Sequence, residues 1–177
     1  MDAQRRPRAP LPTPKAQIPA VCVVSGSFLS GAMLSLSAFV VPVFLDTNNN
    51  ANHMLRQWVR LYHYGHIYLP ALCIATCGLY GYAALTQRAA KTKHWYRYGV
   101  AAVWTIAMVP FTWVAMSPTN DILFSLEASG SAETAAADLV HVRGLVVKWA
   151  WLHVTRSLSP LVGAFVGLRA LLHDIRA

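Results

Sequence analysis

Three long stretches without a charged residue constrain this chain more than any other feature of its sequence. No Asp, Glu, Lys or Arg occurs in residues 16–45, 61–87 or 98–120. Each stretch is longer than the roughly 20 residues that a helix needs to cross the hydrocarbon core of a bilayer. The chain has 177 residues, of which 55% are hydrophobic and 12% are charged. These proportions predict an integral membrane protein rather than a soluble domain.

A fourth span is predicted at about residues 149–172, provided that it tolerates Arg156. With spans at about 18–45, 61–87 and 97–118, it predicts an all-α bundle of four transmembrane helices, with residues 18–173 as one domain. Residues 1–17 are rich in Pro and Arg, and we expect them to form a disordered cytoplasmic tail. The first apolar run is too long for the core of a secretory signal, so it is interpreted as a retained helix.

The basic residues predict the topology, because Lys and Arg near helix ends resist transfer across the membrane. One side of a four-span arrangement collects Arg5, Arg6, Arg8, Lys15, Arg88, Lys91, Lys93, Arg97, Arg169 and Arg176. The opposite side mixes four basic residues, Arg56, Arg60, Arg143 and Lys148, with acidic ones. Both termini are therefore expected in the cytoplasm. The net charge of +8 is attributed to topology and to an anionic leaflet, and no nucleic-acid partner is predicted.

Small residues recur at helical spacing in the first and last spans. Gly26, Ser30 and Ala38 belong to one such ridge, and Ser159, Gly163 and Gly167 form another. Ridges of this kind allow close helix packing, which is the favoured interpretation, although they can also form a cavity wall. The connection at residues 121–148 is predicted to be the longest, with Ser131 as a possible helix cap.

Polar residues gather at the ends of the predicted spans that lie on the side of the membrane opposite the cytoplasm. His153 and Arg156 are three residues apart and share one helix face. On the second span, His66 lies four residues from Tyr62 and three from His63, so these side chains also converge. Asn120 ends the third span at the same depth. The sequence thus predicts a polar pocket above an apolar bundle, with snorkelling of Arg156 and a buried core His153 as the alternative.

The sequence lacks the motifs of several common kinds of functional site. The imidazoles of His63, His66 and His153 do not have an Asp or Glu within a span to complete a metal site, so no metal is predicted, although one is not excluded. Nucleotide-binding loops, a serine nucleophile elbow and paired carboxylates are absent from the sequence. Without a CxxC motif, the cysteines are expected to be core residues, which disfavours a thiol or quinone oxidoreductase.

Four segments together resemble a known family. FLSGAMLSLSAFVVPVFLDT, QWVRLYHYGHIYLP, MSPTN and WLHVTRSLSPLVGAFVGL, in this order and spacing, are similar to the anthrone oxygenases of fungal aromatic polyketide pathways. The resemblance covers residues 28–168, and its specificity lies in the combination of short apolar motifs. It implies a four-helix membrane enzyme that oxidises a tricyclic anthrone to its anthraquinone with O2, without haem, flavin or a recognised metal.

The candidate residues allow a hypothesis for this implied reaction. Deprotonating the acidic methylene of an anthrone gives an electron-rich anion that reacts with O2, so the protein needs a base and an anion stabiliser. His66 or His153 is the candidate base, and Arg156 is the candidate stabiliser. The candidate substrate-binding residues are Trp58, Tyr62, His63 and Asn120.

The alternative to catalysis is a membrane protein that binds or passes a lipophilic aromatic metabolite, or that scaffolds polyketide pathway enzymes. Such a protein would use the same apolar groove but would not need His153, His66 or Arg156 to ionise. Phe substitutions at His66 and His153, assayed by anthrone consumption in membranes, would separate the two hypotheses, because only an enzyme requires an imidazole.

Overall fold

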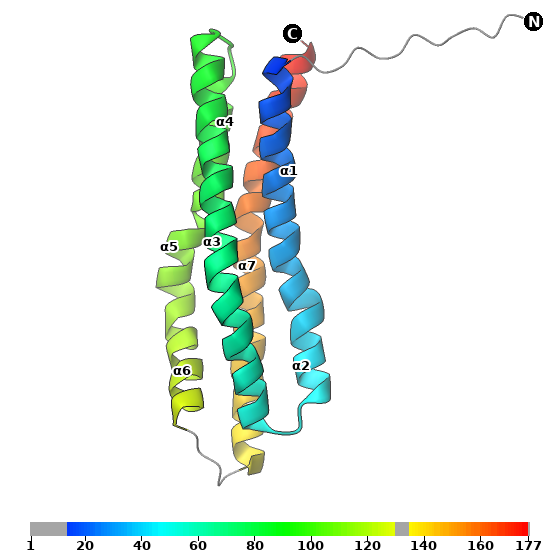
Figure 1. The fold of residues 1–177 in the computed structure, drawn as a ribbon, viewed down its shortest axis with the longest axis vertical. Coiled ribbons are helices and arrows are strands. Elements are labelled where there is room, and N and C mark those ends of the chain that lie inside the picture. The colour runs from blue at the N-terminus through cyan, green and yellow to red at the C-terminus, as the bar shows by residue number, and fades with distance from the viewer. Residues whose placement is uncertain (1–13, 130–134, 177) are drawn as a thin grey trace, which may run out of the picture.

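The computed structural model describes residues 14–129 and 135–176, and every regular element within these ranges is helical. In chain order the elements are α1 (Pro14–Ser35), the π-helical turn η1 (Leu36–Val40), α2 (Val41–Thr47), α3 (Ala51–Ala89), α4 (Trp95–Ile106), α5 (Met108–Phe111), the π-helical turn η2 (Thr112–Met116), α6 (Ser117–Ala128) and α7 (Ala135–Arg176). They form four rods, α1–η1–α2, α3, α4–α5–η2–α6 and α7 (Figure 1). The predicted all-α, four-transmembrane-helix fold is confirmed.

The apolar helical segments are longer than the predicted spans. They cover Gln17–Thr47, Ala51–Ala89, Tyr96–Ala128 and Leu139–Arg176. The polar sequence after Asn120 and before Trp149 continues the helices instead of forming a long loop, because α6 reaches Ala128 and α7 begins at Ala135. Ser131, the expected helix cap, lies outside the described residues.

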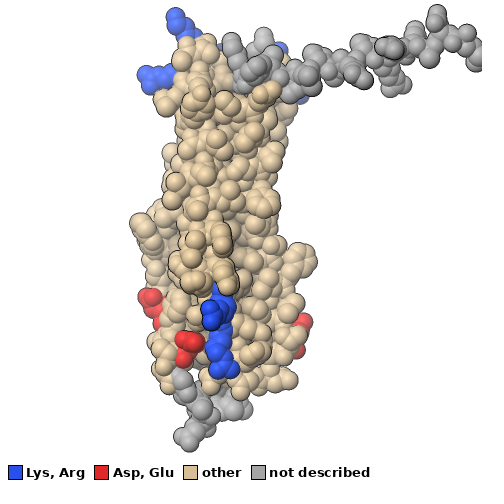
Figure 2. Space-filling view, in the orientation of Figure 1, with Lys and Arg blue, Asp and Glu red and all other residues tan. Residues whose placement is uncertain are grey.

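The rods pack as an up-and-down bundle. α7 packs along α1 and α4, and α3 packs along the same two helices. The start of α1 and the end of α7 lie at one end of the bundle, beside the α3–α4 turn (Figure 1). On the face shown in Figure 2, Lys and Arg lie at this end without visible Asp or Glu, whereas near the other end Lys or Arg lies together with Asp and Glu. We call these the basic end and the mixed-charge end.

The outer surface of the bundle suits a lipid environment. Phe39, Val114 and Trp151 are 70%, 80% and 69% exposed, respectively. Figure 2 shows an uncharged zone across the middle of the molecule. Water would solvate so large an apolar surface poorly, whereas hydrocarbon tails accommodate it. The chain is therefore an integral membrane protein.

Glycines allow the rods to approach closely. A Cβ added at Gly163 would lie 2.6 Å from Thr105 Oγ1 and 2.8 Å from the Ala101 carbonyl oxygen, both on α4. One added at Gly167 would lie 2.7 Å from the Tyr80 ring on α3. These small residues therefore serve close packing between spans, as favoured from the sequence.

The π turns share one sequence cause. Val41 donates its N–H to Leu36 O, and Ser117 donates its N–H to Thr112 O, so both turns close over five residues. Proline follows each donor, at Pro42 and Pro118. A proline has no N–H, and its ring crowds the carbonyl four residues earlier, which disfavours regular α-helical pairing at this point.

Candidate active site

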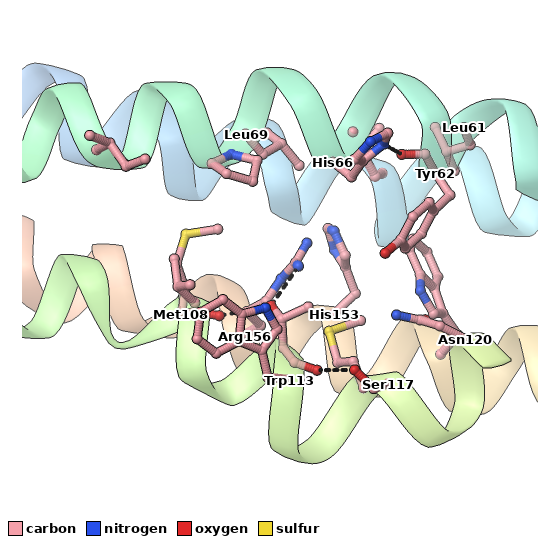
Figure 3. Close-up of a pocket in the computed structure, with 18 residues that line it drawn as sticks. Leu61, Tyr62, His66, Leu69, Met108, Trp113, Ser117, Asn120, His153 and Arg156 are labelled. Carbon is pink, nitrogen blue, oxygen red and sulfur yellow. Dashed lines mark hydrogen bonds between the residues drawn. The ribbon is translucent and has the colours of Figure 1, made fainter.

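A cavity of about 390 Å³ lies in the half of the bundle toward the mixed-charge end. Its walls come mainly from α3, from α7 and from the α5–η2–α6 part of the third rod. Its polar lining residues are Tyr62, His66, Thr112, Ser117, Asn120, His153 and Arg156 (Figure 3). Most other lining residues are apolar or aromatic, and the volume falls in the range of about 300–1,000 Å³ that is typical of small-molecule sites.

A bend in the third rod opens this space. The helix is interrupted at Ala107, and Pro110 follows within α5. Pro110 cannot donate a hydrogen bond to the Ile106 carbonyl, so the rod changes direction here. Figure 1 shows α5 and α6 displaced sideways from the line of α4. Met108, Val109 and Trp113 on the displaced part then face α3 across the cavity.

His153 is the buried imidazole of the site, with 1% of its surface exposed. Its ring stacks on Trp149 at a centroid distance of 4.7 Å. Its Nδ1 lies 3.3 Å from Ser37 Oγ, and that hydroxyl donates to the Ala150 carbonyl at 3.2 Å. Because the single hydroxyl hydrogen is directed at Ala150, only the oxygen lone pairs face Nδ1. In the tautomer that carries hydrogen on Nδ1, this nitrogen donates to Ser37 Oγ and Nε2 is left as a free base.

Arg156 lies one turn along α7 and points into the cavity beside His153 (Figure 3). Its Nη1 donates to Thr112 Oγ1 at 2.9 Å, while that hydroxyl donates to Met108 O at 2.8 Å. Its Nε is buried and has no hydrogen-bond partner within the described part of the chain. No Asp or Glu forms an ion pair with Arg156 among the described side chains. A guanidinium with spare donors in an apolar cavity is well suited to bind an anion.

Asn120 contributes an unused acceptor. Its side chain is 3% exposed, and its Oδ1 is buried without a hydrogen-bond partner in residues 14–129 and 135–176. The indole Nε1 of Trp149, which also lines the cavity, has no partner in these ranges either. Unpaired buried polar atoms are costly, so a bound ligand that hydrogen-bonds to them would be stabilised.

Tyr62 and His66 lie across the cavity, on α3. Their rings stack at 5.4 Å, and His66 Nδ1 donates to the Tyr62 carbonyl at 3.1 Å. His66 is an exposed residue, unlike His153. The two imidazoles therefore lie in different settings within one site: His153 is enclosed, whereas His66 is accessible from outside.

Trp58 and His63 do not line the cavity, although the sequence suggested them as substrate-binding residues. Trp58 is fully buried and packs against Tyr62 and Trp149, at centroid distances of 5.4 and 6.0 Å. His63 is exposed on another face of α3 and meets His66 only at its ring edge, 5.7 Å between centroids. Within residues 14–129 and 135–176, no group of three His, Cys, Asp or Glu residues is placed to hold a metal ion.

The sequence interpretation did not include Ser37 or Thr112. Each hydroxyl lies on a π turn and contacts one of the two predicted α7 side chains. A serine or threonine is common in membrane spans, so residue type alone gives no signal. The available signal was the pair of prolines at positions 42 and 118, because each lies just after a π turn and π turns often occur at functional sites.

Comparisons with known proteins all point to one family. The sequence profile of the anthrone oxygenases matches residues 58–166. An anthrone oxygenase of Aspergillus novofumigatus is 60% identical, over 93% of this chain and 99% of the relative. Another, from a Cryptosporiopsis species, is 50% identical over 92% and 93% of the two chains. A noranthrone monooxygenase of Aspergillus flavus is 36% identical over 88% of this chain and 74% of the relative. No solved structure matches the chain.

Proposed function

The chain belongs to the anthrone oxygenase family, and from this premise we propose that it oxidises a polyketide-derived anthrone to the corresponding anthraquinone with O2. The observation that carries the proposal is the pairing of an enclosed imidazole, His153, with the guanidinium of Arg156 in one apolar cavity. The first can remove a proton and the second can stabilise the negative charge that results.

The substrate is a flat tricyclic ketone, and the cavity offers matching surfaces. Leu69, Met108 and Trp113 supply apolar walls, while Tyr62 supplies an aromatic ring. The Asn120 Oδ1 can accept a hydrogen bond from a ring hydroxyl. An apolar substrate of this kind partitions into lipid, so we propose entry sideways from the bilayer.

The first chemical step is proton removal from the methylene that lies opposite the ketone. We assign this proton to His153 Nε2, in the tautomer whose Nδ1 carries hydrogen and donates to Ser37 Oγ. The resulting anion has an aromatic central ring and places its charge on the ketone oxygen. Arg156 stabilises that oxygen with its remaining N–H donors.

The electron-rich anion then reacts with O2 to form a C–O bond, giving a hydroperoxide at the former methylene carbon. Loss of the remaining C–H proton and cleavage of the O–O bond produce the second ketone and release water. Anthrone plus O2 thus gives anthraquinone plus water, with all electrons supplied by the substrate. The reaction needs no external reductant, and we propose that it proceeds without haem, flavin or metal.

The arrangement in the membrane is part of the proposal. The start of α1 and the end of α7 both lie at the basic end of the bundle (Figures 1 and 2). Basic residues are retained on the cytoplasmic side, which supports cytoplasmic termini and a site near the opposite surface. We also propose that the chain works alongside other enzymes of its polyketide pathway, which make its substrate and use its product.

The test is turnover by purified protein in detergent, with an anthrone and O2, comparing His153→Gln and His66→Gln. We expect His153→Gln to lower kcat by about 100-fold or more, because a general base contributes about 10² to 10⁴. His66→Gln should mainly change KM, since His66 lies at the exposed side of the cavity. Chelator should leave the rate unchanged.

His141→Gln is the matched control, because His141 is an exposed imidazole on the same helix, away from the cavity. Unchanged kcat in both cavity variants would remove the catalytic assignment of these histidines. A wild-type rate no higher than spontaneous oxidation, with substrate binding retained, would favour a binding or carrier protein. Loss of activity with chelator would contradict the metal-free reaction.

A further inference from the structure

A second hollow lies at the basic end, far along the bundle from the first. It is lined by Arg97, Arg169, Leu172, His173 and Arg176 and has a volume of about 560 Å³. Arg97 comes from the first turn of α4, and the other residues come from the last turns of α7. Among the described residues, the lining thus contains three guanidinium groups, an imidazole and one apolar side chain, and it includes no carboxylate.

A second imidazole adds to this positive cluster. The rings of His94 and His173 lie 4.0 Å apart between centroids. His94 Nδ1 is buried and has no hydrogen-bond partner among the residues that the structure describes. The pKa of His94 lies below its usual range because of desolvation, and because His173, Arg97 and Lys93 oppose a further positive charge, although Asp174 partly offsets them. A bound anion would relieve this repulsion.

Asp174, which follows His173 in the sequence, has another partner. Asp174 Oδ2 accepts a hydrogen bond from the Tyr98 hydroxyl at 2.8 Å. Tyr98 is fully buried between the helices. Asp174 is therefore held against α4 rather than within the hollow, and it leaves the guanidinium groups of the lining without an ion pair among the described residues.

An apolar strip leads from the hollow along α7 toward the middle of the bundle. Phe165, Leu168 and Leu172 are 60%, 37% and 44% exposed. The Arg169 guanidinium lies 6.0 Å from the Phe165 ring centroid, at the border between the strip and the charged end. A ligand that fills both regions must join an anionic head to a long apolar tail.

From this arrangement we infer that the basic end carries a binding site for an anionic phospholipid. The phosphate occupies the hollow between Arg97, Arg169 and Arg176, and an acyl chain lies on the strip of Phe165, Leu168 and Leu172. A guanidinium group can bind two phosphate oxygens at once, and basic residues near an anionic membrane surface add electrostatic attraction. The site lies outside the cavity proposed for oxidation and is independent of that reaction.

The test is native mass spectrometry of the full-length protein, purified in detergent and titrated with dioleoyl phosphatidic acid or dioleoyl phosphatidylcholine. We expect one phosphatidic acid to be retained in preference to phosphatidylcholine. Arg97→Gln/Arg169→Gln should weaken this binding by about tenfold or more. The control, Arg88→Gln/Lys91→Gln, removes the same charge at the same end outside the hollow and should change binding by less than about twofold.

Equal weakening in the two double variants would overturn the inference in favour of general surface charge. Equal retention of both lipids by the wild-type protein would also overturn it, and this arm needs no variant. Inorganic phosphate distinguishes the remaining source, because displacement of phosphatidic acid by millimolar phosphate would show a site for the free ion rather than for a lipid. If the Gln variant does not fold, Arg97→Lys/Arg169→Lys replaces it, and this variant should retain most of the binding.

Discussion

At the scale of single residues, two hydroxyl groups organise the proposed chemistry without reaching the substrate. Ser37 and Thr112 each donate to a backbone carbonyl and present lone pairs to His153 and Arg156, respectively. The hydroxyls therefore act as positioning residues. The protein thereby fixes an imidazole and a guanidinium using neutral partners, which leaves the positive charge of Arg156 available to an anion.

Ser37→Ala tests the role assigned to the His153 tautomer. Loss of the acceptor at Nδ1 frees the imidazole to adopt the other tautomer, so we expect kcat to fall by about tenfold, with Ser37→Thr retaining more activity. Turnover and the ¹⁵N chemical shifts of His153 measure the two effects separately. Ser35→Ala is the control, because that hydroxyl bonds only to Ala32 O in its own helix. An unchanged tautomer in Ser37→Ala would contradict the assignment.

Arg156 and Thr112 allow a graded test of anion stabilisation. Arg156→Gln should lower kcat by about 100- to 1,000-fold, as for loss of a donor to a developing oxyanion. Thr112→Val keeps the side-chain shape but removes the acceptor, so a loss of about tenfold is expected. Arg143→Gln is a useful comparison, because Arg143 donates to the carbonyls of Leu45 and Asn48 outside the cavity. Equal kcat in all three variants and the wild type would exclude this role for Arg156.

At the scale of helices, the four spans were predictable because uncharged length is a strong signal in a membrane. The convergence of His153, Arg156, Asn120, Tyr62 and His66 on one cavity was also predictable, since helical spacing and depth are readable from sequence. Helix rotation is not readable in this way, and it places Trp58 in the core and His63 on an outer face. Each π turn at a proline closes over one residue more than an α-helical turn does. It therefore changes the helix rotation locally.

Gly163 tests the close approach of α4 and α7. In Gly163→Ala, the new methyl group would meet the Ala101 carbonyl at 2.8 Å, and backbone cannot move aside as a side chain can. We expect a loss of about 1–3 kcal/mol in stability, measured by thermal unfolding in detergent. Gly99→Ala, on α4, is the control because nothing lies within 4 Å of its added methyl group. Equal stability of the two variants would show that the helices are not so closely packed.

At the scale of the whole molecule, the helices pack closely between the hollow at the basic end and the cavity, and they separate toward the mixed-charge end. Gly163 and Gly167 hold α7 against α4 and α3 in the closely packed part. The bend at Ala107 then moves the third rod aside, and the cavity occupies the space that results. Ile74 lines the cavity and is also 62% exposed on the lipid-facing surface of α3. The cavity therefore reaches the surface where hydrocarbon tails lie.

Ile74→Trp tests lateral entry at this point. An indole here narrows the opening while leaving His153 and Arg156 in place, so KM for an anthrone should rise by about tenfold with little change in kcat. Leu85→Trp is the matched control, since Leu85 is 65% exposed on the same helix and does not line the cavity. Leu61→Trp narrows the cavity toward the mixed-charge end instead. If only Leu61→Trp raised KM, the substrate would enter from the membrane surface, because obstruction matters only along the route that the substrate takes.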